Sequence, residues 1–165
     1  MITFKEIEEI KKEGFVGFKP MRELFKDSSV VPQERGVYMV LNLSKEKEFL
    51  TVGTGGFFKG KNPNVSPQTL ENNWVENTIV VYIGKAGGEE SGATLQSRLG
   101  QYFRFGQGKN VGHYGGRLIW QLKNSENLVV CWKELPDEDP RTVESLLIRE
   151  FVSQFSKRPF ANLKD

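Results

Sequence analysis

The sequence predicts an α/β or α+β fold in a single domain that spans residues 1–165. Apolar, β-branched runs alternate along the chain with amphipathic helical patterns, which is typical of a mixed architecture of strands and helices. No repeat, low-complexity tract or linker-like segment divides the chain. Its length is sufficient to bury a hydrophobic core without disulfides or metals.

The N-terminal half is expected to begin with two helices, over residues 3–13 and 20–25. Residues 36–43, GVYMVLNL, are apolar and β-branched and predict a strand, with residues 47–53 as its hairpin partner. Residues 53–68 are rich in Gly, Pro and Asn and predict a long loop.

The next segments predict three strands and one helix. Residues 77–84, NTIVVYIG, are almost continuously apolar and predict a central strand. Residues 94–105 have apolar side chains at helical spacing, with Thr94 as the N-cap. Residues 117–122 and 127–135 flank a polar turn and predict a hairpin.

The last helix places a carboxylate where an apolar residue is expected. Residues 137–155 predict a helix with Asp139 as N-cap and Pro140 at its first position. At about 100° per residue, Glu144 falls near the middle of the apolar side of this helix. Because burying an unpaired charge is costly, Glu144 is expected either to pair with an internal Arg or Lys or to bind a metal. Mg²⁺ suits a single carboxylate, since waters and phosphate oxygens complete its coordination.

Composition argues against several classes of protein. No apolar run approaches the roughly 20 residues that span a bilayer, so no membrane association is expected. The charged N-terminal helix lacks the apolar region of a signal peptide. The single cysteine, Cys131, is expected to fill the core, which fits a reducing cytoplasm. One histidine and one cysteine provide no ordinary zinc site.

The net charge of +2 conceals an uneven distribution. Residues 91–125 contain no Asp or Glu and carry five cations. Such a stretch favours a polyanionic partner such as DNA, the alternative being a solvated basic face without a partner. The segment QYFRFGQGKNVGHYGGR (101–117) suits contact with a nucleic-acid backbone, and its candidate DNA-binding residues are Arg104, Lys109, His113 and Arg117. A lone loop histidine such as His113 is alternatively solvated, hydrogen-bonded or an auxiliary acid.

Residues 55–62, GGFFKGKN, nearly fit the phosphate-binding P-loop pattern. Asn62 stands where that pattern requires Ser or Thr, and Pro63 and Pro67 follow. The helix that should hold the phosphates is therefore not expected, and neither is an NTPase.

Several titratable groups lie where strands and helices begin or end. Tyr82 and Lys85 lie at the junction of a strand with a glycine-rich loop, and Tyr38 lies early in the first strand. Arg98 and Tyr102 are four residues apart and share a helix face. If the two strands are neighbours, Lys85, Arg98 and a metal would favour a phenolate and lower the tyrosine pKa from about 10. A phenolate could deprotonate water for attack on phosphorus, while the cations stabilise the developing charge.

The segments GVY (36–38) and YIG (82–84) resemble the two halves of the GIY-YIG nuclease signature. The resemblance covers residues 34–163. Each motif is short, but together they stand in the family's order. The further matches are Lys85, the pair Arg98 and Tyr102, Glu144, and Asn162 within RPFANL.

This resemblance implies a small central antiparallel sheet, usually three-stranded, with helices around it. Residues 1–33 would form an N-terminal helical extension. The two signature halves lie further apart than in compact members, so residues 43–77 would be an insertion. The implied activity is hydrolysis of DNA phosphodiester bonds with Mg²⁺ or Mn²⁺. Target recognition would come from the insertion, a homodimer or a partner.

The resemblance also implies a role for each matched residue. Tyr82 would be the general base, with Tyr38 supporting it or sharing that role. The others would surround the scissile phosphate, with Lys85 polarising the phenol or water, Arg98 and Tyr102 contacting the phosphate, Glu144 holding the metal and Asn162 bracing the site. The alternative function is a non-catalytic nucleic-acid-binding module that retains the fold, and a protein-interaction domain is a third class.

Overall fold

Four strands form one antiparallel sheet in the computed structural model, which describes residues 2–89 and 91–163. The sheet order is β1-β4-β2-β3, and every neighbouring pair is antiparallel. The strands are β1 (Val16–Pro20), β2 (Gly36–Leu41), β3 (Val80–Ala86) and β4 (Val129–Glu134). The predicted α+β fold with a small antiparallel sheet is confirmed.

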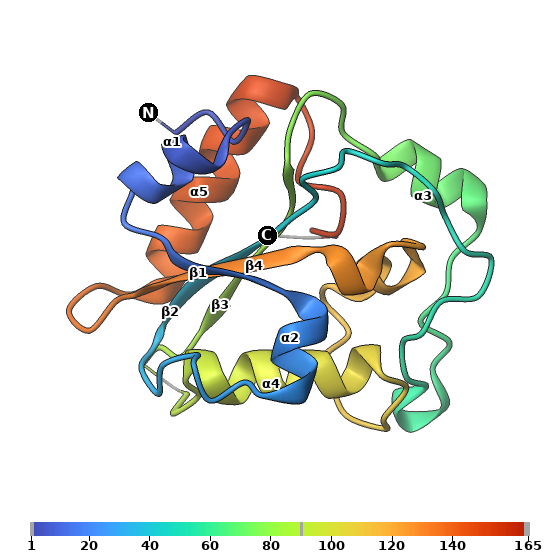
Figure 1. Ribbon diagram of the computed structural model, residues 1–165, viewed down its shortest axis with the longest axis horizontal. Helices are drawn as coiled ribbons and strands as arrows, with labels where there is room; N and C mark the ends of the chain where they lie inside the picture. The colour runs from blue at the N-terminus through green and yellow to red at the C-terminus, as the bar shows by residue number, and fades with distance from the viewer. Residues whose placement is uncertain (1, 90, 164–165) are drawn as a thin grey trace.

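Helices cover both faces of this sheet (Figure 1). One face packs against α1 and α5, the other against α2 and α4, and each face has its own apolar cluster. The helices are α1 (Ile7–Lys12), α2 (Met21–Lys26), α3 (Pro67–Asn73), α4 (Leu95–Gly106) and α5 (Pro140–Phe155). Among the described residues, none of the helices has the length and apolar character that a membrane span requires.

The predicted starts of the two longest helices are confirmed. Thr94 is the N-cap of α4, and its hydroxyl accepts a hydrogen bond from Ser97 N–H while the Ser97 hydroxyl accepts one from Thr94 N–H. This reciprocal arrangement satisfies two backbone donors that the helix leaves free. Asp139 precedes Pro140 at the start of α5, as expected, although its carboxylate accepts from the Thr142 hydroxyl instead of a backbone amide.

β3 is an edge strand, which corrects the expectation that it is central. Its free edge is covered by the C-terminal segment, where Ala161 N–H donates to Val81 O at 2.8 Å. The Asn162 amide donates to Ile83 O and accepts from Ile83 N–H, both at 2.9 Å. These contacts, with a helix on each face, explain why an edge strand has the apolar composition of a central one.

Both predicted hairpins are wrong. Residues 47–53 do not pair with β2, because β3 and β4 occupy its two edges; Phe49 forms only an isolated bridge with Leu122. The segment predicted as a strand at 117–122 is instead the 3₁₀ helix η2 (Arg117–Gln121). Four of its five residues are buried, and a short apolar run that is buried on every side carries no period that distinguishes strand from helix.

The expected N-terminal helical extension also contains a strand. β1 pairs with the outer edge of β4 and adds a fourth strand to the three that the resemblance implies. The segment at 43–77 contains the helix α3, which was not predicted and whose first turn overlaps the end of the loop expected at 53–68. Buried Gln121 anchors this segment, since its amide donates to the carbonyls of Leu50, Thr51 and Val65.

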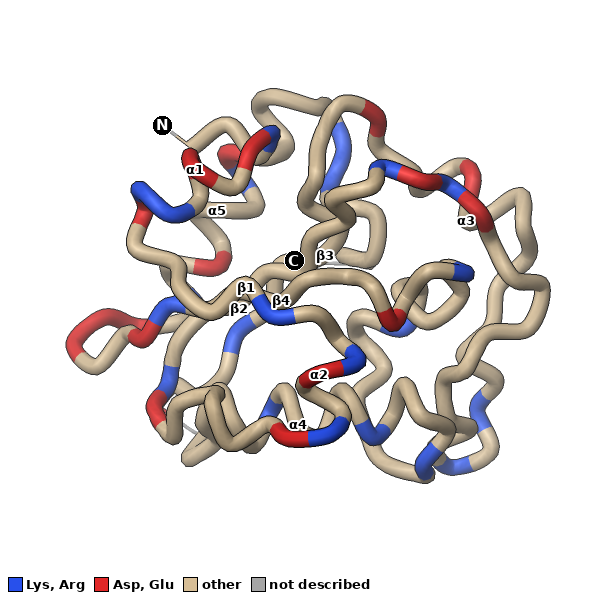
Figure 2. The backbone as a smooth tube through the Cα atoms, in the orientation of Figure 1, with Lys and Arg blue, Asp and Glu red and all other residues tan. Residues whose placement is uncertain are grey.

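Charged side chains are unevenly distributed over the fold (Figure 2). The loop between β4 and α5 is acidic and contains Asp137, Glu138 and Asp139. At the opposite end, the 3₁₀ helix η1 (Phe58–Gly60) lies beside the C-terminal end of α4, and only Lys and Arg are charged there.

Candidate active site

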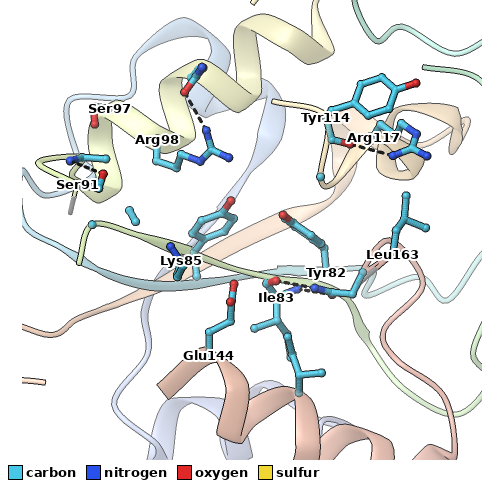
Figure 3. Close-up of a pocket in the computed structure, with 18 of the residues that line it drawn as sticks. Tyr82, Ile83, Lys85, Ser91, Ser97, Arg98, Tyr114, Arg117, Glu144 and Leu163 are labelled. Atoms are coloured by element: carbon cyan, nitrogen blue, oxygen red, sulfur yellow. Dashed lines mark hydrogen bonds between the residues drawn. The ribbon is translucent and has the colours of Figure 1, made fainter. Parts of the chain in front are cut away.

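A cavity of about 1060 Å³ opens beside edge strand β3, between α4 and α5 (Figure 3). The two helices lie on opposite faces of the sheet, and side chains from both line the cavity. Six of the seven residues that the resemblance marks as catalytic line this cavity: Tyr38, Tyr82, Lys85, Arg98, Glu144 and Asn162. The seventh, Tyr102, is fully buried in the adjoining core.

The register of β2 and β3 brings Tyr38 and Tyr82 together. Tyr38 pairs with Gly84 and Val40 pairs with Tyr82, so the two tyrosines are diagonal neighbours on one face of β2 and β3. Their ring centroids are 6.0 Å apart. A Cβ at position 84 would overlap the Tyr38 ring, so glycine is required for the ring to lie across β3.

His113 and Tyr102 lie behind the cavity and hold these tyrosines in place. His113 Nε2 is 3.4 Å from the Tyr38 hydroxyl, and its ring packs 4.2 Å from the Tyr102 ring. The Tyr102 hydroxyl donates to Gly116 O at 2.7 Å. The side chain of His113 is 1% exposed, and burial lowers its pKa to about 3, so the imidazole is neutral at pH 7.

Two sequence expectations for this cluster are therefore corrected. His113 lies in the interior, hydrogen-bonded to Tyr38 and neutral at pH 7, so it is neither exposed for direct contact with DNA nor in the imidazolium form that an auxiliary acid requires. The Tyr102 hydroxyl donates to Gly116 O and the side chain does not line the cavity, so the structure does not place it for the expected contact with a phosphate.

In the chain without a metal ion, the pKa of Tyr82 is raised, whereas the sequence predicted that Lys85, Arg98 and a metal would lower it. Burial is the main cause and the Glu144 carboxylate adds to it, giving a value of about 12, although the neighbouring Tyr38 hydroxyl and the Arg98 charge act in the opposite direction. Burial also raises the pKa of Tyr38 well above its ordinary value, and the neighbouring Tyr82 raises it further. Of the two phenols, Tyr82 is the less completely buried, with 8% of the residue exposed against 1% for Tyr38.

Glu144 extends from α5 into the cavity, toward Lys85 (Figure 3). Burial raises its pKa, and the charges of Lys85, Arg141 and Arg98 partly offset this effect. Within residues 2–89 and 91–163, no Lys or Arg nitrogen lies within 4.0 Å of its carboxylate oxygens. Glu144 therefore does not form the direct ion pair with an Arg or Lys that was one of its two expected roles.

A divalent cation at Glu144 would have one protein carboxylate as a ligand. Nowhere in the described part of the chain do three His, Cys, Asp or Glu side chains gather as a metal-binding group. Mg²⁺ and Mn²⁺ fit a site with a single carboxylate beside a water-accessible cavity, because Mg²⁺ retains several waters and also binds substrate phosphates.

Cations outnumber carboxylates around the cavity. Arg98 donates to Gln101 Oε1 at 3.0 Å, and Arg117 lies over the Tyr114 ring, 4.1 Å from its centroid. The Nε of Arg117 is buried and has no partner among the described residues. Among the described residues, one carboxylate, that of Glu144, lines the cavity with four cationic side chains: Lys85, Arg98, Arg104 and Arg117. This balance suits the binding of a phosphate diester.

The other candidate DNA-binding residues divide into two groups. Arg104 and Arg117 line the cavity, whereas Lys109 is exposed and does not line it. Sequence reasoning missed Gln101 and Tyr114, both of which line the cavity. The position of Gln101, one turn after Arg98, is a signal that could have identified it.

Replacing Asn162 with alanine is expected to lower the free energy of unfolding by about 2–4 kcal/mol, because it leaves the N–H and C=O of Ile83 unpaired in a buried place. Urea unfolding followed by circular dichroism would measure this change. The control is Asn72→Ala at an exposed amide on α3, where about 0.5 kcal/mol or less is expected. Equal stability of the two variants would contradict a bracing role for Asn162.

The chain has no significant match among protein-family models, curated proteins or solved structures. The cavity and its residues are therefore the basis for assigning a function.

Proposed function

We propose that this protein is a metal-dependent DNA endonuclease of the GIY-YIG type. The observation that carries the proposal is that, among the described residues, two tyrosines, one carboxylate and four cations converge on one cavity. Pure binding of a polyanion needs no half-buried carboxylate among its cations, since that group repels phosphate. A carboxylate in this place is useful if a divalent cation bridges it to the phosphate.

Arg98 is the electrostatic centre of the proposed site. Its charge acts on the pKa values of Tyr38, Tyr82, His113 and Glu144. A guanidinium in this position would bind the scissile phosphate and stabilise the charge that develops on its oxygens. A Mg²⁺ or Mn²⁺ ion held by Glu144 would supply further stabilisation as a Lewis acid.

Tyr82 is the general base in this proposal. A water oxygen attacks phosphorus and forms a P–O bond as the bond to the leaving oxygen breaks. The water proton passes to the Tyr82 phenolate, and the leaving oxygen takes a proton from solvent. Tyr38, whose ring centroid is 6.0 Å from that of Tyr82, would stabilise the Tyr82 phenolate with its hydroxyl. Lys85 contributes a positive charge at the cavity wall.

A non-catalytic nucleic-acid-binding module is the second candidate. The pKa of about 12 for Tyr82 favours it, because a phenol that is protonated at neutral pH is a weak base. This candidate predicts salt-dependent binding to DNA and no cleavage with any divalent cation.

Incubation of the full chain with supercoiled plasmid tests the two candidates directly. With Mg²⁺ or Mn²⁺, we expect conversion to nicked or linear DNA, and we expect a chelator to stop it. Binding without conversion under either metal would reject the nuclease and support the binding module.

A further inference from the structure

Two segments without acidic residues lie against each other at one end of the molecule. Residues 49–70 contain no Asp or Glu, and neither do residues 91–125. They are joined by backbone contacts, since Gly56 N–H donates to Phe105 O at 2.9 Å. The fold therefore adds the charges of two distant parts of the sequence. Figure 2 shows the outcome as a region at the lower right with blue but no red segments.

One series of contacts connects the insertion to the cavity through α4. Lys59 N–H donates to the Asn110 side chain at 3.4 Å, beside exposed Lys109. Lys109 N–H in turn donates to Arg104 O at 3.0 Å, and Arg104 lines the cavity.

A second series reaches the cavity from the same segment of the insertion. The Tyr114 hydroxyl donates to Asn62 O at 2.7 Å, beside exposed Lys61. The guanidinium of Arg117 lies over the Tyr114 ring, and both residues line the cavity. No salt bridge neutralises Lys59, Lys61, Lys109, Arg104 or Arg117 within the described residues.

We propose that Lys59 and Lys61 form a second contact with the DNA backbone, outside the cavity. We call Lys59, Lys61, Lys109, Arg104 and Arg117 the basic strip. The inference rests on the proposed function, because it takes DNA as the partner. When a phosphate of the DNA is bound in the cavity, the position of its strand is fixed. The side chains of the basic strip then contact phosphates on either side of the one that is cleaved. In this proposal the GGFFKGKN segment (55–62), which resembles a P-loop, binds phosphates of the DNA backbone and not those of a nucleotide.

The test measures binding of a duplex that extends beyond the cavity, by fluorescence anisotropy over a range of salt concentrations with a chelator present. The variant is Lys59→Asn with Lys61→Gln. Asparagine is chosen because Lys59 has a φ of 53°, which Asn tolerates better than most residues. We expect affinity to fall about tenfold and the slope of log K against log salt to fall by about 2, one for each phosphate contact.

The matched control removes two positive charges elsewhere, with Lys11→Gln and Lys12→Gln on α1. This helix lies at the other end of the molecule (Figure 1), and the two side chains are 51% and 73% exposed. Its affinity is expected to stay within about twofold of the unmodified protein. A single Lys61→Glu variant, at ordinary backbone angles, should lose more affinity than Lys61→Gln.

The outcomes separate this inference from the nuclease proposal. One outcome is that the unmodified protein cleaves DNA with Mg²⁺ while the variant Lys59→Asn with Lys61→Gln binds like the control. That result would overturn the second DNA contact and leave the nuclease proposal standing. If DNA binding depends on Lys59 and Lys61 but no metal supports cleavage, the nuclease proposal fails and the second DNA contact is supported. Absence of any DNA binding would overturn both.

Discussion

Replacing Glu144 with glutamine is expected to reduce DNA cleavage by about a thousandfold or more and to leave the fold intact. The amide retains the shape of the side chain but loses the charge that would hold the cation. Loss of about 4 kcal/mol of Lewis-acid stabilisation corresponds to this factor. Because burial raises the pKa of Glu144, the neutral amide should not lower the melting temperature. Initial rates of plasmid nicking and thermal unfolding measure the two effects.

The control is Glu150→Gln, which removes the same charge from the same helix at a residue that does not line the cavity. Its rate is expected to stay within about twofold of the unmodified protein. If the Glu144 variant and the unmodified protein cleave equally, the activity comes from a contaminant and the nuclease proposal is rejected.

Elements with strong local signals could be predicted from the sequence. α4 has a capping residue, Thr94, followed by apolar side chains at helical spacing, and these signals need no knowledge of tertiary contacts. β2 and β3 are β-branched runs long enough to be recognised as strands.

The elements that sequence analysis missed depend on tertiary contacts or on short signals. β1 contains Gly17, Phe18 with a φ of 55° and a terminal proline, so its strand character comes from pairing with β4. η2 is buried because the insertion wraps around it, which no local pattern reveals. For α3, Ser66 followed by Pro67 was a usable start signal, but the surrounding Gly, Pro and Asn residues obscured it.

The candidate site was predictable as a set of residues but not as an arrangement. Sequence order was enough to select Tyr38, Tyr82, Arg98 and Glu144, which do meet at one cavity. The buried place of His113 was not predictable, because it depends on how a glycine-rich loop folds back on the tyrosines. The rise in the pKa of Tyr82 in the chain without a metal was not foreseen, because burial outweighs the opposing charge of Arg98.

Replacing Tyr82 with phenylalanine is expected to reduce cleavage by about a thousandfold, whereas Tyr38→Phe should cost only about tenfold. The first variant removes the base, and general-base catalysis contributes factors of about 10² to 10⁴. The second removes the neighbouring hydroxyl that lowers the pKa of Tyr82, and a change of one pKa unit corresponds to about tenfold. Single-turnover rates on a labelled duplex would measure both.

The pH dependence provides an independent test of the same assignment. With a pKa of about 12, Tyr82 is almost entirely protonated at pH 7, so its phenolate fraction grows about tenfold for each pH unit below the pKa. The cleavage rate should therefore rise about tenfold per unit from about pH 7 to 9, and this slope should disappear in Tyr82→Phe. A cation on Glu144 would offset the carboxylate charge that raises the pKa of Tyr82. The cleavage rate is therefore expected to reach its plateau at a lower pH as the metal concentration increases.

A larger loss of cleavage in Tyr38→Phe than in Tyr82→Phe would exchange the two roles. A cleavage rate that is independent of pH would reject a tyrosine base.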